Sequence, residues 1–382
     1  MKLRFWGVRG STPTPWRESL RYGGNTSCVE VRTARGDVFI FDCGTGLRPL
    51  GKELMEERGH ASISAFIFLS HYHWDHIQGI PFFEPLYNPE NHFFFHSFPA
   101  HTQTVQRALE EQMSDPYFPV DMGAMAAHRH FYNLCNDQVE FNGTRLTAMR
   151  LNHPQGCLGY RLECGSRAIA YATDNEPGKA DFDRNVRSLA EGADVLIYDA
   201  QYTPLEYVNF KKGWGHSTWR EAVTIAREAG VKTLVLFHHD PDHNDAMIDS
   251  IVHEAAREFP GVLAAAEGLE IDLSGEQTAI RMPAERRAGD RRLVHLPLVV
   301  EGRRADGLSF VEHTILENLS LSGAFFELEN EPDPRRELTI HLKLSSEPSD
   351  TARVLQVVSR VVRTEDAEQP NKRGVAVVFP PH

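Results

Sequence analysis

The chain has 382 residues and a formal net charge of −13, with 53 acidic and 40 basic side chains. This acidity argues against bulk attraction for nucleic acid, although it does not exclude an anionic substrate at a site that holds cations. Five cysteines without a Cys-x-x-Cys pair argue against a disulfide framework, and no window is long and apolar enough to cross a bilayer, so we expect a cytoplasmic protein without membrane contact.

A dense group of potential metal ligands follows the apolar run Ala65–Leu69, which has the length and composition of a buried strand. Imidazole and carboxylate donors suit Zn²⁺, Fe or Mn²⁺. Four of them this close cannot all reach one tetrahedral ion without strain, so we expect two neighbouring ions. A histidine-rich surface loop is the alternative, and it fits poorly because apolar residues flank the group. The four donors are His71, His73, Asp75 and His76.

Residues from about Phe82 to Met125 form an insert rich in phenylalanine and proline, with a helix-like segment from Thr102 to Met113. We expect this insert to wall a pocket for a small substrate. A helical cover packed through residues 93–95 is the alternative, and it is compatible with such a pocket.

Three further donors stand at the ends of predicted strands. His153 follows the strand-like segment Arg145–Asn152, and Asp174 follows a predicted hairpin that turns at Gly165. His238 follows the apolar run Thr233–Phe237. A loop histidine or a turn aspartate would be an ordinary explanation for each alone, but their shared placement allows one sheet edge to gather all of them.

The segment His-Tyr-His-Trp-Asp-His matches the His-x-His-x-Asp-His signature of the metallo-β-lactamase fold. The segments Phe5–Ser11, Tyr22–Cys28 and Phe41–Gly46 resemble the opening strands and turns of its phosphodiesterase and ribonuclease Z-like branch. The resemblance covers roughly the first 275 residues and implies an α+β fold, an αββα sandwich that carries a two-metal hydrolase site.

This resemblance also implies roles for the donors. Asp75 would orient or deprotonate the attacking water, and His239 stays open between a supporting and a structural role. The implied ligands are His71, His73 and His153 for one ion, Asp75, His76 and His238 for the other, and Asp174 as the bridge between them.

His216 precedes a helix-like segment from Trp219 to Ala229, in which Ser217 or Thr218 could be the cap. It matches the histidine of a His-Ser-Thr element in ribonuclease Z-like proteins, which implies contact with a phosphate oxygen or protonation of the leaving oxygen. The alternative is a histidine of the capping region alone. The chain shows no long glycine- and proline-rich arm and has Tyr171 where that branch is acidic, so transfer RNA maturation is disfavoured.

The length favours a second domain. We place domains at residues 1–275 and 286–382, with a linker at 276–285. Arg-x-x-x-Arg followed by Asn-x-Ser-x-x-Gly resembles the PilZ domain, which implies a small antiparallel β-barrel that binds cyclic di-GMP; a solvated basic linker is the alternative. The matching residues are Arg287, Arg291, Asn318, Ser320 and Gly323.

The leading hypothesis is a hydrolase that uses two divalent ions, with zinc favoured over manganese or iron, to cleave a small linear or cyclic nucleotide or a similar phosphodiester. Cyclic di-GMP would regulate it through the second domain. The alternative is a cyclic di-GMP receptor with little turnover, whose metal domain is a sensor or an interaction module. A homodimer is compatible with these features, but the sequence leaves the oligomeric state and the direction of regulation open.

Overall fold

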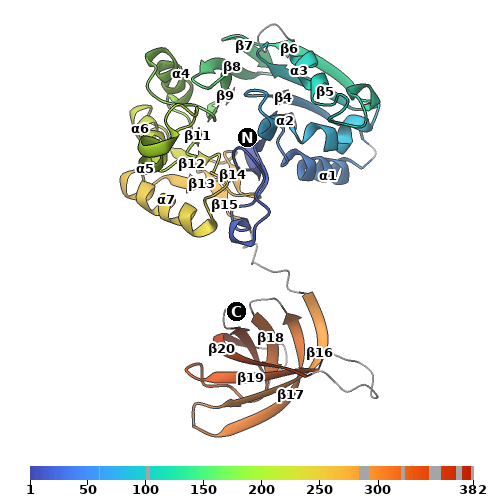
Figure 1. Cartoon of the computed structure of the whole chain (residues 1–382), viewed down its shortest axis with the longest axis vertical. Coiled ribbons are helices and arrows are strands. Elements are labelled where there is room, and N and C mark those ends of the chain that lie inside the picture. Colours follow the sequence, from blue (N-terminus) through green and yellow to red (C-terminus); the bar gives the residue numbers. More distant parts are fainter. Residues whose placement is uncertain are drawn as a thin grey trace. The chain divides into compact units, whose positions relative to one another are not determined.

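The structure is a computed structural model that describes residues 1–59, 61–99, 104–283, 292–319, 323–343, 354–366 and 372–379. The chain divides into two compact units, Met1–Glu285 and Arg286–His382 (Figure 1). Among the described residues, no helix is long and apolar enough to span a membrane.

The first unit contains two mixed β-sheets. The eight-stranded sheet has the order β15-β14-β1-β2-β3-β4-β5-β6, and the seven-stranded sheet has the order β13-β12-β11-β10-β9-β8-β7. The strands of the first sheet are β1 (Lys2–Gly7), β2 (Cys28–Arg32), β3 (Val38–Phe41), β4 (Ser64–Phe68), β5 (His92–Ser97), β6 (His128–Asn133), β14 (Glu270–Asp272) and β15 (Ala279–Arg281). Those of the second are β7 (Gln138–Phe141), β8 (Thr144–Leu151), β9 (Cys157–Cys164), β10 (Arg167–Ala172), β11 (Val195–Asp199), β12 (Thr233–Phe237) and β13 (Val262–Ala264).

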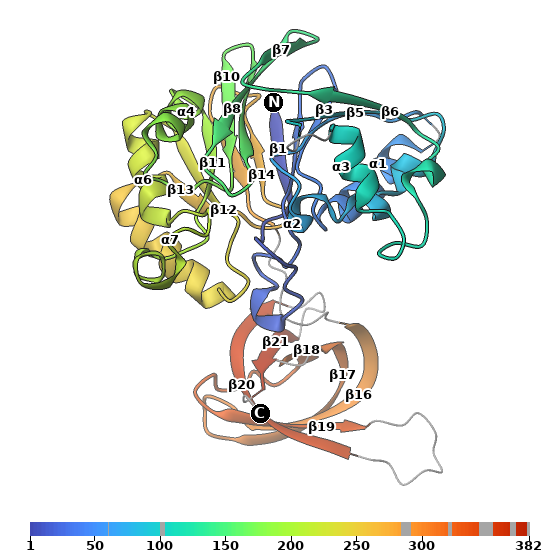
Figure 2. The ribbon, with the colours of Figure 1, turned by 45° about the horizontal axis from the view of Figure 1, so that its top comes forward.

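Helices flank the two sheets on their outer faces, as Figure 2 shows. Helices α1 and α3 pack on the first sheet, and α4, α6 and α7 pack on the second. The longer helices are α1 (Leu47–Arg58), α3 (Val105–Glu111), α4 (Ala180–Ala190), α6 (Trp219–Glu228) and α7 (Asp245–Glu258). The short turns are η1 (Arg17–Ser19), α2 (Trp74–Ile77), η2 (Ile80–Phe82), η3 (Glu84–Tyr87), η4 (Met122–Ala124), α5 (Pro204–Glu206) and the π-helical η5 (Tyr207–Lys211).

Aromatic side chains fill the layer between the sheets. The ring of Phe41 on β3 lies 5.8 Å from that of Tyr160 on β9 and 5.4 Å from that of Tyr171 on β10. Strand β4 is apolar without alternation because Phe68 faces this layer while Ile67 faces α1 and α3. The predicted αββα sandwich is therefore confirmed.

Two segments extend the first sheet in ways that the sequence did not predict. Phe93, Phe94 and Phe95 belong to β5, which pairs in parallel with β4, and Phe93 and Phe95 pack in one core cluster with α3. Ala279–Arg281 lies inside the range predicted as linker but forms β15, which pairs with β14 at the sheet edge.

The second unit is a closed barrel of six strands in the order β16-β17-β18-β21-β20-β19, and every pairing is antiparallel, which confirms the predicted barrel. Of the predicted nucleotide contacts, Asn318 lies on β17 and Gly323 begins β18, whereas Arg287, Arg291 and Ser320 lie outside the described residues. The strands are β16 (Arg292–Arg303), β17 (Ser309–Leu319), β18 (Gly323–Leu328), β19 (Glu337–Lys343), β20 (Val354–Asp366) and β21 (Arg373–Val378).

Candidate metal centre

The predicted donors meet at one edge of the sandwich because the strands that precede them end there. Strands β10, β11 and β12 are parallel, and β8 runs in the same direction because β9 is antiparallel to both β8 and β10. The donors that follow β8, β10 and β12 are therefore brought together with the group that follows β4.

All seven predicted donors approach one another closely. The ligand atoms of His71, His73 and His153 lie within 4.8 Å of one another, and so do those of Asp75, His76 and His238. Asp174 lies between these two groups. One of its carboxylate oxygens is 3.8 Å from Nε2 of His71 and of His153, and the other is 3.4 Å from Nε2 of His76 and of His238.

Hydrogen bonds from Nδ1, the ring nitrogen remote from the other donors, orient the imidazoles of His76 and His238. Nδ1 of His76 donates to Asp42 Oδ2 at 2.8 Å, and Nδ1 of His238 donates to Gln201 Oε1 at 2.9 Å. Because each of these acceptors fixes the proton on Nδ1, the Nε2 lone pair is left facing the other donors. This arrangement is typical of histidines that ligate a metal.

The donor set fits cations on a second ground. Nε2 of His71 is buried and has no hydrogen-bond partner among the described residues. Nε2 of His153 lies 3.2 Å from Nδ1 of His73. The other nitrogen of each ring donates, Nδ1 of His153 to the carbonyl of Gly215 and Nε2 of His73 to Gln155 Oε1 at 3.0 Å, so two lone pairs face each other. Buried nitrogen lone pairs that face one another are unfavourable unless a positive charge lies between them.

Three residues beside the centre have left-handed backbone conformations, namely Asp42, Asp174 and His238, with φ values of 59°, 53° and 61°. Asp42 and His238 directly follow β3 and β12, and Asp174 lies two residues beyond the end of β10. A non-glycine residue in this region costs of order 1–3 kcal/mol and persists where the surrounding structure enforces it, often at functional sites.

His216 lies beside the donors and is held by Asp199. Nδ1 of His216 donates to Asp199 Oδ2 at 2.9 Å, and the other carboxylate oxygen accepts from the backbone N–H groups of Gln201 and Ser217. His216 Nδ1 is also 3.7 Å from Asp174. Burial opposes protonation, but Asp199 and Asp174 together raise the pKa of His216 to about 9. Helix α6 follows directly, capped by Thr218, whose Oγ1 accepts from the N–H of Glu221.

Burial and neighbouring charges set the protonation of the other groups. Burial lowers the pKa of His153 to about 4 and holds that of His71 well below its ordinary value. Burial alone would raise the pKa of Asp75, but His76 and His238 hold it well below the ordinary range. His71 and His153 are thus biased toward the neutral form, and Asp75 toward the ionised form, that metal ligation requires. His76 differs, because Asp75, Asp174 and Asp42 outweigh burial and raise its pKa well above the ordinary value.

The sequence did not reveal the residues that orient the donors. Asp42, Asp199 and Gln201 are each ordinary polar residues near a strand end, and the only signal is that Asp42 directly follows β3 and Asp199 is the last residue of β11. His239, which the sequence left open, donates from Nε2 to the carbonyl of Ala265 at 2.9 Å and belongs to none of the donor groups found among the described residues.

Two cavities adjoin the donors. One of about 470 Å³ is lined by the predicted donors His73, Asp75 and Asp174 and by His216. Its other lining residues are Ser11, Tyr72 and Trp74. The second, of about 790 Å³, begins at His153 and extends to Glu176, Lys179, Tyr207 and Lys212.

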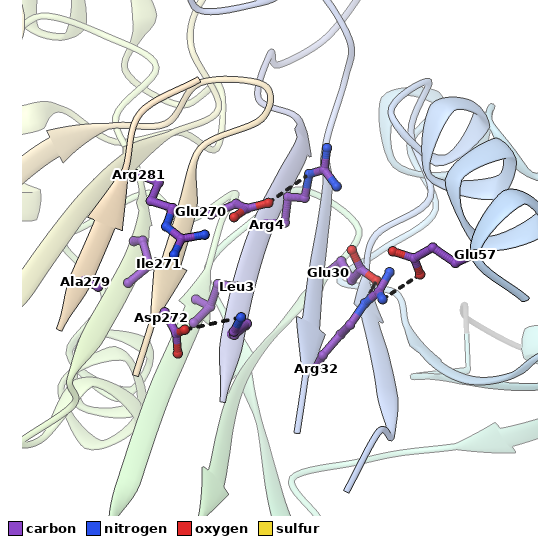
Figure 3. Close-up of a pocket in the computed structure, with 11 residues that line it drawn as sticks. Leu3, Arg4, Glu30, Arg32, Glu57, Glu270, Ile271, Asp272, Ala279 and Arg281 are labelled. Carbon is purple, nitrogen blue, oxygen red and sulfur yellow. Dashed lines mark hydrogen bonds and ion pairs between the residues drawn. The ribbon is translucent and has the colours of Figure 1, made fainter. Parts of the chain in front are cut away.

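A smaller cavity of about 200 Å³ lies over β1, β2, β14 and β15 and shares no lining residue with these two (Figure 3). Ion pairs cross it, including Lys2 with Asp272 at 3.4 Å and Arg4 with Glu270 at 3.6 Å. Its charges neutralise one another, so we assign it no ligand.

Comparison with known families agrees with this geometry. Residues 38–239 match the family described as the beta-lactamase superfamily domain, and residues 285–382 match the PilZ domain. The chain belongs to the β-lactamase superfamily and carries a PilZ domain. It is a metal-dependent hydrolase of the metallo-β-lactamase fold, as the sequence predicted.

Individual relatives cover the first unit. The chain is 26% identical to ribonuclease Z of Haloarcula marismortui over 322 residues, which is 71% of this chain and 96% of the relative. It is 26% identical to ribonuclease Z of Brevibacillus brevis, covering 74% of this chain and all of the relative.

Solved structures share the fold. The metallo-β-lactamase fold protein YhfI from Bacillus subtilis superposes with a TM-score of 0.54 at 21% identity, covering 70% of this chain and 97% of YhfI. The short form of human tRNase Z gives a TM-score of 0.52 at 20% identity, covering 72% of this chain and all of that protein.

Proposed function

We propose that the first unit is a dinuclear hydrolase of small phosphodiesters and that cyclic di-GMP bound to the PilZ domain regulates it. The observation that carries the catalytic half is the convergence of seven donors, with Asp174 between two groups of three. A structural scaffold has no need for that many buried, mutually facing lone pairs.

The proposed ligands divide as the donor groups do: His71, His73 and His153 for one ion, Asp75, His76 and His238 for the other, and Asp174 for both. Zinc is our first choice because imidazole and carboxylate donors suit it, with manganese or iron as alternatives. When bound, such a pair lowers the pKa of a water and neutralises charge on the phosphoryl oxygens.

The chain's own residues supply orientation and proton transfer. The backbone N–H of Ser11 donates to Asp75 Oδ2 at 2.7 Å, which fixes a carboxylate that can accept the proton of the attacking water. His216, held through Nδ1 by Asp199, can give a proton to the leaving oxygen. Water oxygen adds to phosphorus, the P–O bond to the leaving group breaks, and the products are a phosphomonoester and an alcohol.

A phosphodiester substrate is supported by the relatives, whose names describe them as ribonuclease Z. A small substrate is supported by the segment between His153 and Asp174, which contains the hairpin β9–β10 and no long arm that could hold RNA. The net charge of −13 likewise disfavours a long polyanion.

Regulation by cyclic di-GMP is supported by the match to the PilZ family. The proposed contacts are Arg287 and Arg291 to phosphate and guanine, and Asn318, Ser320 and Gly323 where the backbone approaches the nucleotide. Guanidinium groups bind phosphate in a bidentate manner and stack on planar bases, so the residue types suit this ligand.

Hydrolysis of bis-p-nitrophenyl phosphate with added Zn²⁺ or Mn²⁺ tests the catalytic proposal. We expect turnover by the wild type, two metal ions per chain by elemental analysis, and loss of turnover in Asp75→Ala. Asp181→Ala is the matched control, because that carboxylate is 86% exposed. Equally negligible rates in wild type and Asp75→Ala would contradict the enzyme and favour a receptor with little turnover.

Calorimetry with cyclic di-GMP tests the regulatory proposal. We expect binding to the full chain, at least tenfold weaker binding to Arg287→Ala, and unchanged binding to Arg335→Ala, an exposed arginine in a turn of the barrel. The rate of hydrolysis should change when the nucleotide is added. Absence of binding to the intact protein would remove the regulatory half of the proposal.

A further inference from the structure

Trp74 is the one exposed side chain in the segment from His71 to His76. Its exposed fraction is 75%, whereas His71, Asp75 and His76 are buried. It begins the short helix α2, directly between the proposed ligands His73 and Asp75. The indole therefore stands beside the metal donors without being part of the core.

The backbone that carries Trp74 is held firmly. The hydroxyl of the preceding Tyr72 donates to the carbonyl of Phe98 at 2.5 Å, and the two rings lie 5.6 Å apart. The carbonyl of Trp74 itself accepts from the N–H of Gln78 at 2.8 Å. These contacts fix where the indole emerges, so a ligand that packs on it would meet a preorganised surface.

Trp74 differs from an ordinary exposed tryptophan in its position beside the proposed metal ligands. Single exposed apolar residues are common and need no explanation. Trp6, Trp214 and Trp219 each have a cation over the ring, whereas the described residues place none over Trp16 or Trp74. Of these last two, Trp74 lines the 470 Å³ cavity that holds Asp75, Asp174 and His216, and Trp16 does not.

We propose that Trp74 is a stacking platform for a nucleobase of the substrate, so that the enzyme prefers phosphodiesters of nucleosides to aliphatic ones. This inference rests on the proposed phosphodiester hydrolysis. The indole face offers a large planar surface that stacks on any base without reading its hydrogen-bonding edge. The preference is therefore for a base as such, with little discrimination between bases.

Two substrates with the same leaving group isolate the contribution of the base: thymidine 5′-(p-nitrophenyl phosphate) and methyl p-nitrophenyl phosphate. In Trp74→Ala we expect kcat/KM for the thymidine ester to fall about 10- to 100-fold, the scale of one base–aromatic stack. For the methyl ester the change should stay within about threefold. Trp74→Phe should restore most of the loss, and Trp16→Ala, which removes another exposed indole, should leave both substrates unchanged.

Equilibrium dialysis with thymidine 5′-monophosphate separates failure of this inference from failure of the proposed hydrolysis. If the wild type cleaves neither ester, the proposed activity is wrong, but binding at least tenfold weaker in Trp74→Ala would still support stacking. Equal binding by wild type and Trp74→Ala overturns the inference. An equal loss of kcat/KM for both esters overturns it as well, because that result would place Trp74 in the support of the metal ligands.

Discussion

His153 donates from Nδ1 to the carbonyl oxygen of Gly215 at 2.8 Å, which joins a proposed metal ligand to the loop that presents His216. Gly215 has φ of +89°, and a Cβ there would lie 2.3 Å from Pro154 Cδ and 2.5 Å from His153 Nδ1. We predict that Gly215→Ala displaces His153 and weakens metal binding by about 10- to 100-fold, the effect usual for lost support of a ligand. Metal content after dialysis against a chelator measures this.

Gly213→Ala is the control for that prediction. Gly213 lies in the same loop and has the same φ of +89°, but a Cβ there meets nothing within 4 Å. Both substitutions carry the backbone strain of an alanine at positive φ, so the difference between them reports the contact with His153. Equal metal loss in the two variants would contradict the assigned role of Gly215.

Glu176 accepts hydrogen bonds from the backbone of the same loop. One carboxylate oxygen accepts from the N–H of Gly213 at 2.6 Å and from the hydroxyl of Tyr207 at 3.0 Å, and the other accepts from the N–H of Gly215 at 2.9 Å. Glu176→Gln replaces one acceptor by a donor that faces a donor, so we expect about tenfold weaker metal binding in a folded protein. Tyr207→Phe, which removes only the hydroxyl, should cost much less. Circular dichroism checks folding, and unchanged metal affinity in Glu176→Gln would refute the role.

Asp199 fixes the orientation of His216 through the hydrogen bond of 2.9 Å to Nδ1. In Asp199→Asn the amide can present its N–H₂ to the ring, which favours the tautomer with the proton on Nε2 and removes the charge that supports an imidazolium. We expect kcat to fall by about 10² to 10⁴, the usual contribution of a general acid, with metal content retained. Retained kcat would remove His216 from the proton transfer, whereas lost metal would show that Asp199 supports the ligands instead.

The convergence of the seven proposed metal donors could be predicted from the sequence because residue type, order and position after apolar strands all point the same way. The residues that orient them could not. Asp42 bonds a histidine 34 residues away, Gln201 one 37 residues away, and Asp199 one 17 residues away, with no periodic pattern linking the partners. Such pairs are created by the meeting of strand ends, which tertiary structure alone determines.

The sequence did not predict strands β5 and β15, because neither carries a pattern that identifies a strand. Residues 93–95 are apolar without alternation, and the sheet buries Phe93 and Phe95 against the outer helices while the half-buried Phe94 stacks on Phe66. A continuous apolar run does not by itself distinguish a buried strand from a buried helix. Strand β15 is exposed along its whole length, so its sequence carries no pattern and its pairing with β14 defines it.

Asp194 gives a prediction about stability that does not involve the metal centre. Its buried carboxylate accepts from Arg167 at 3.0 Å, from the N–H of Ala168 at 2.9 Å and from Lys232 at 2.8 Å. Burial raises its pKa, but these three partners outweigh burial and hold the pKa below its ordinary value of 3.8. Lys232 is 62% exposed, so we assign most of the stabilisation to the two less exposed partners.

We predict that Asp194→Asn lowers the free energy of unfolding at pH 7 by about 1.5–3 kcal/mol, the range for a hydrogen bond to a charged group. Because the folded-state pKa is depressed, the unfolded chain takes up the proton first as the pH falls. The stabilisation is complete well above pH 3.8 and is lost below it, so the gap between variant and wild type should narrow in acid. Urea denaturation at several pH values measures this gap. The control is Asp181→Asn, whose pair with Arg184 is exposed and whose free energy of unfolding should change by less than about 0.5 kcal/mol. If the difference in free energy of unfolding between Asp194→Asn and the wild type were independent of pH, the charge of Asp194 would not stabilise the fold.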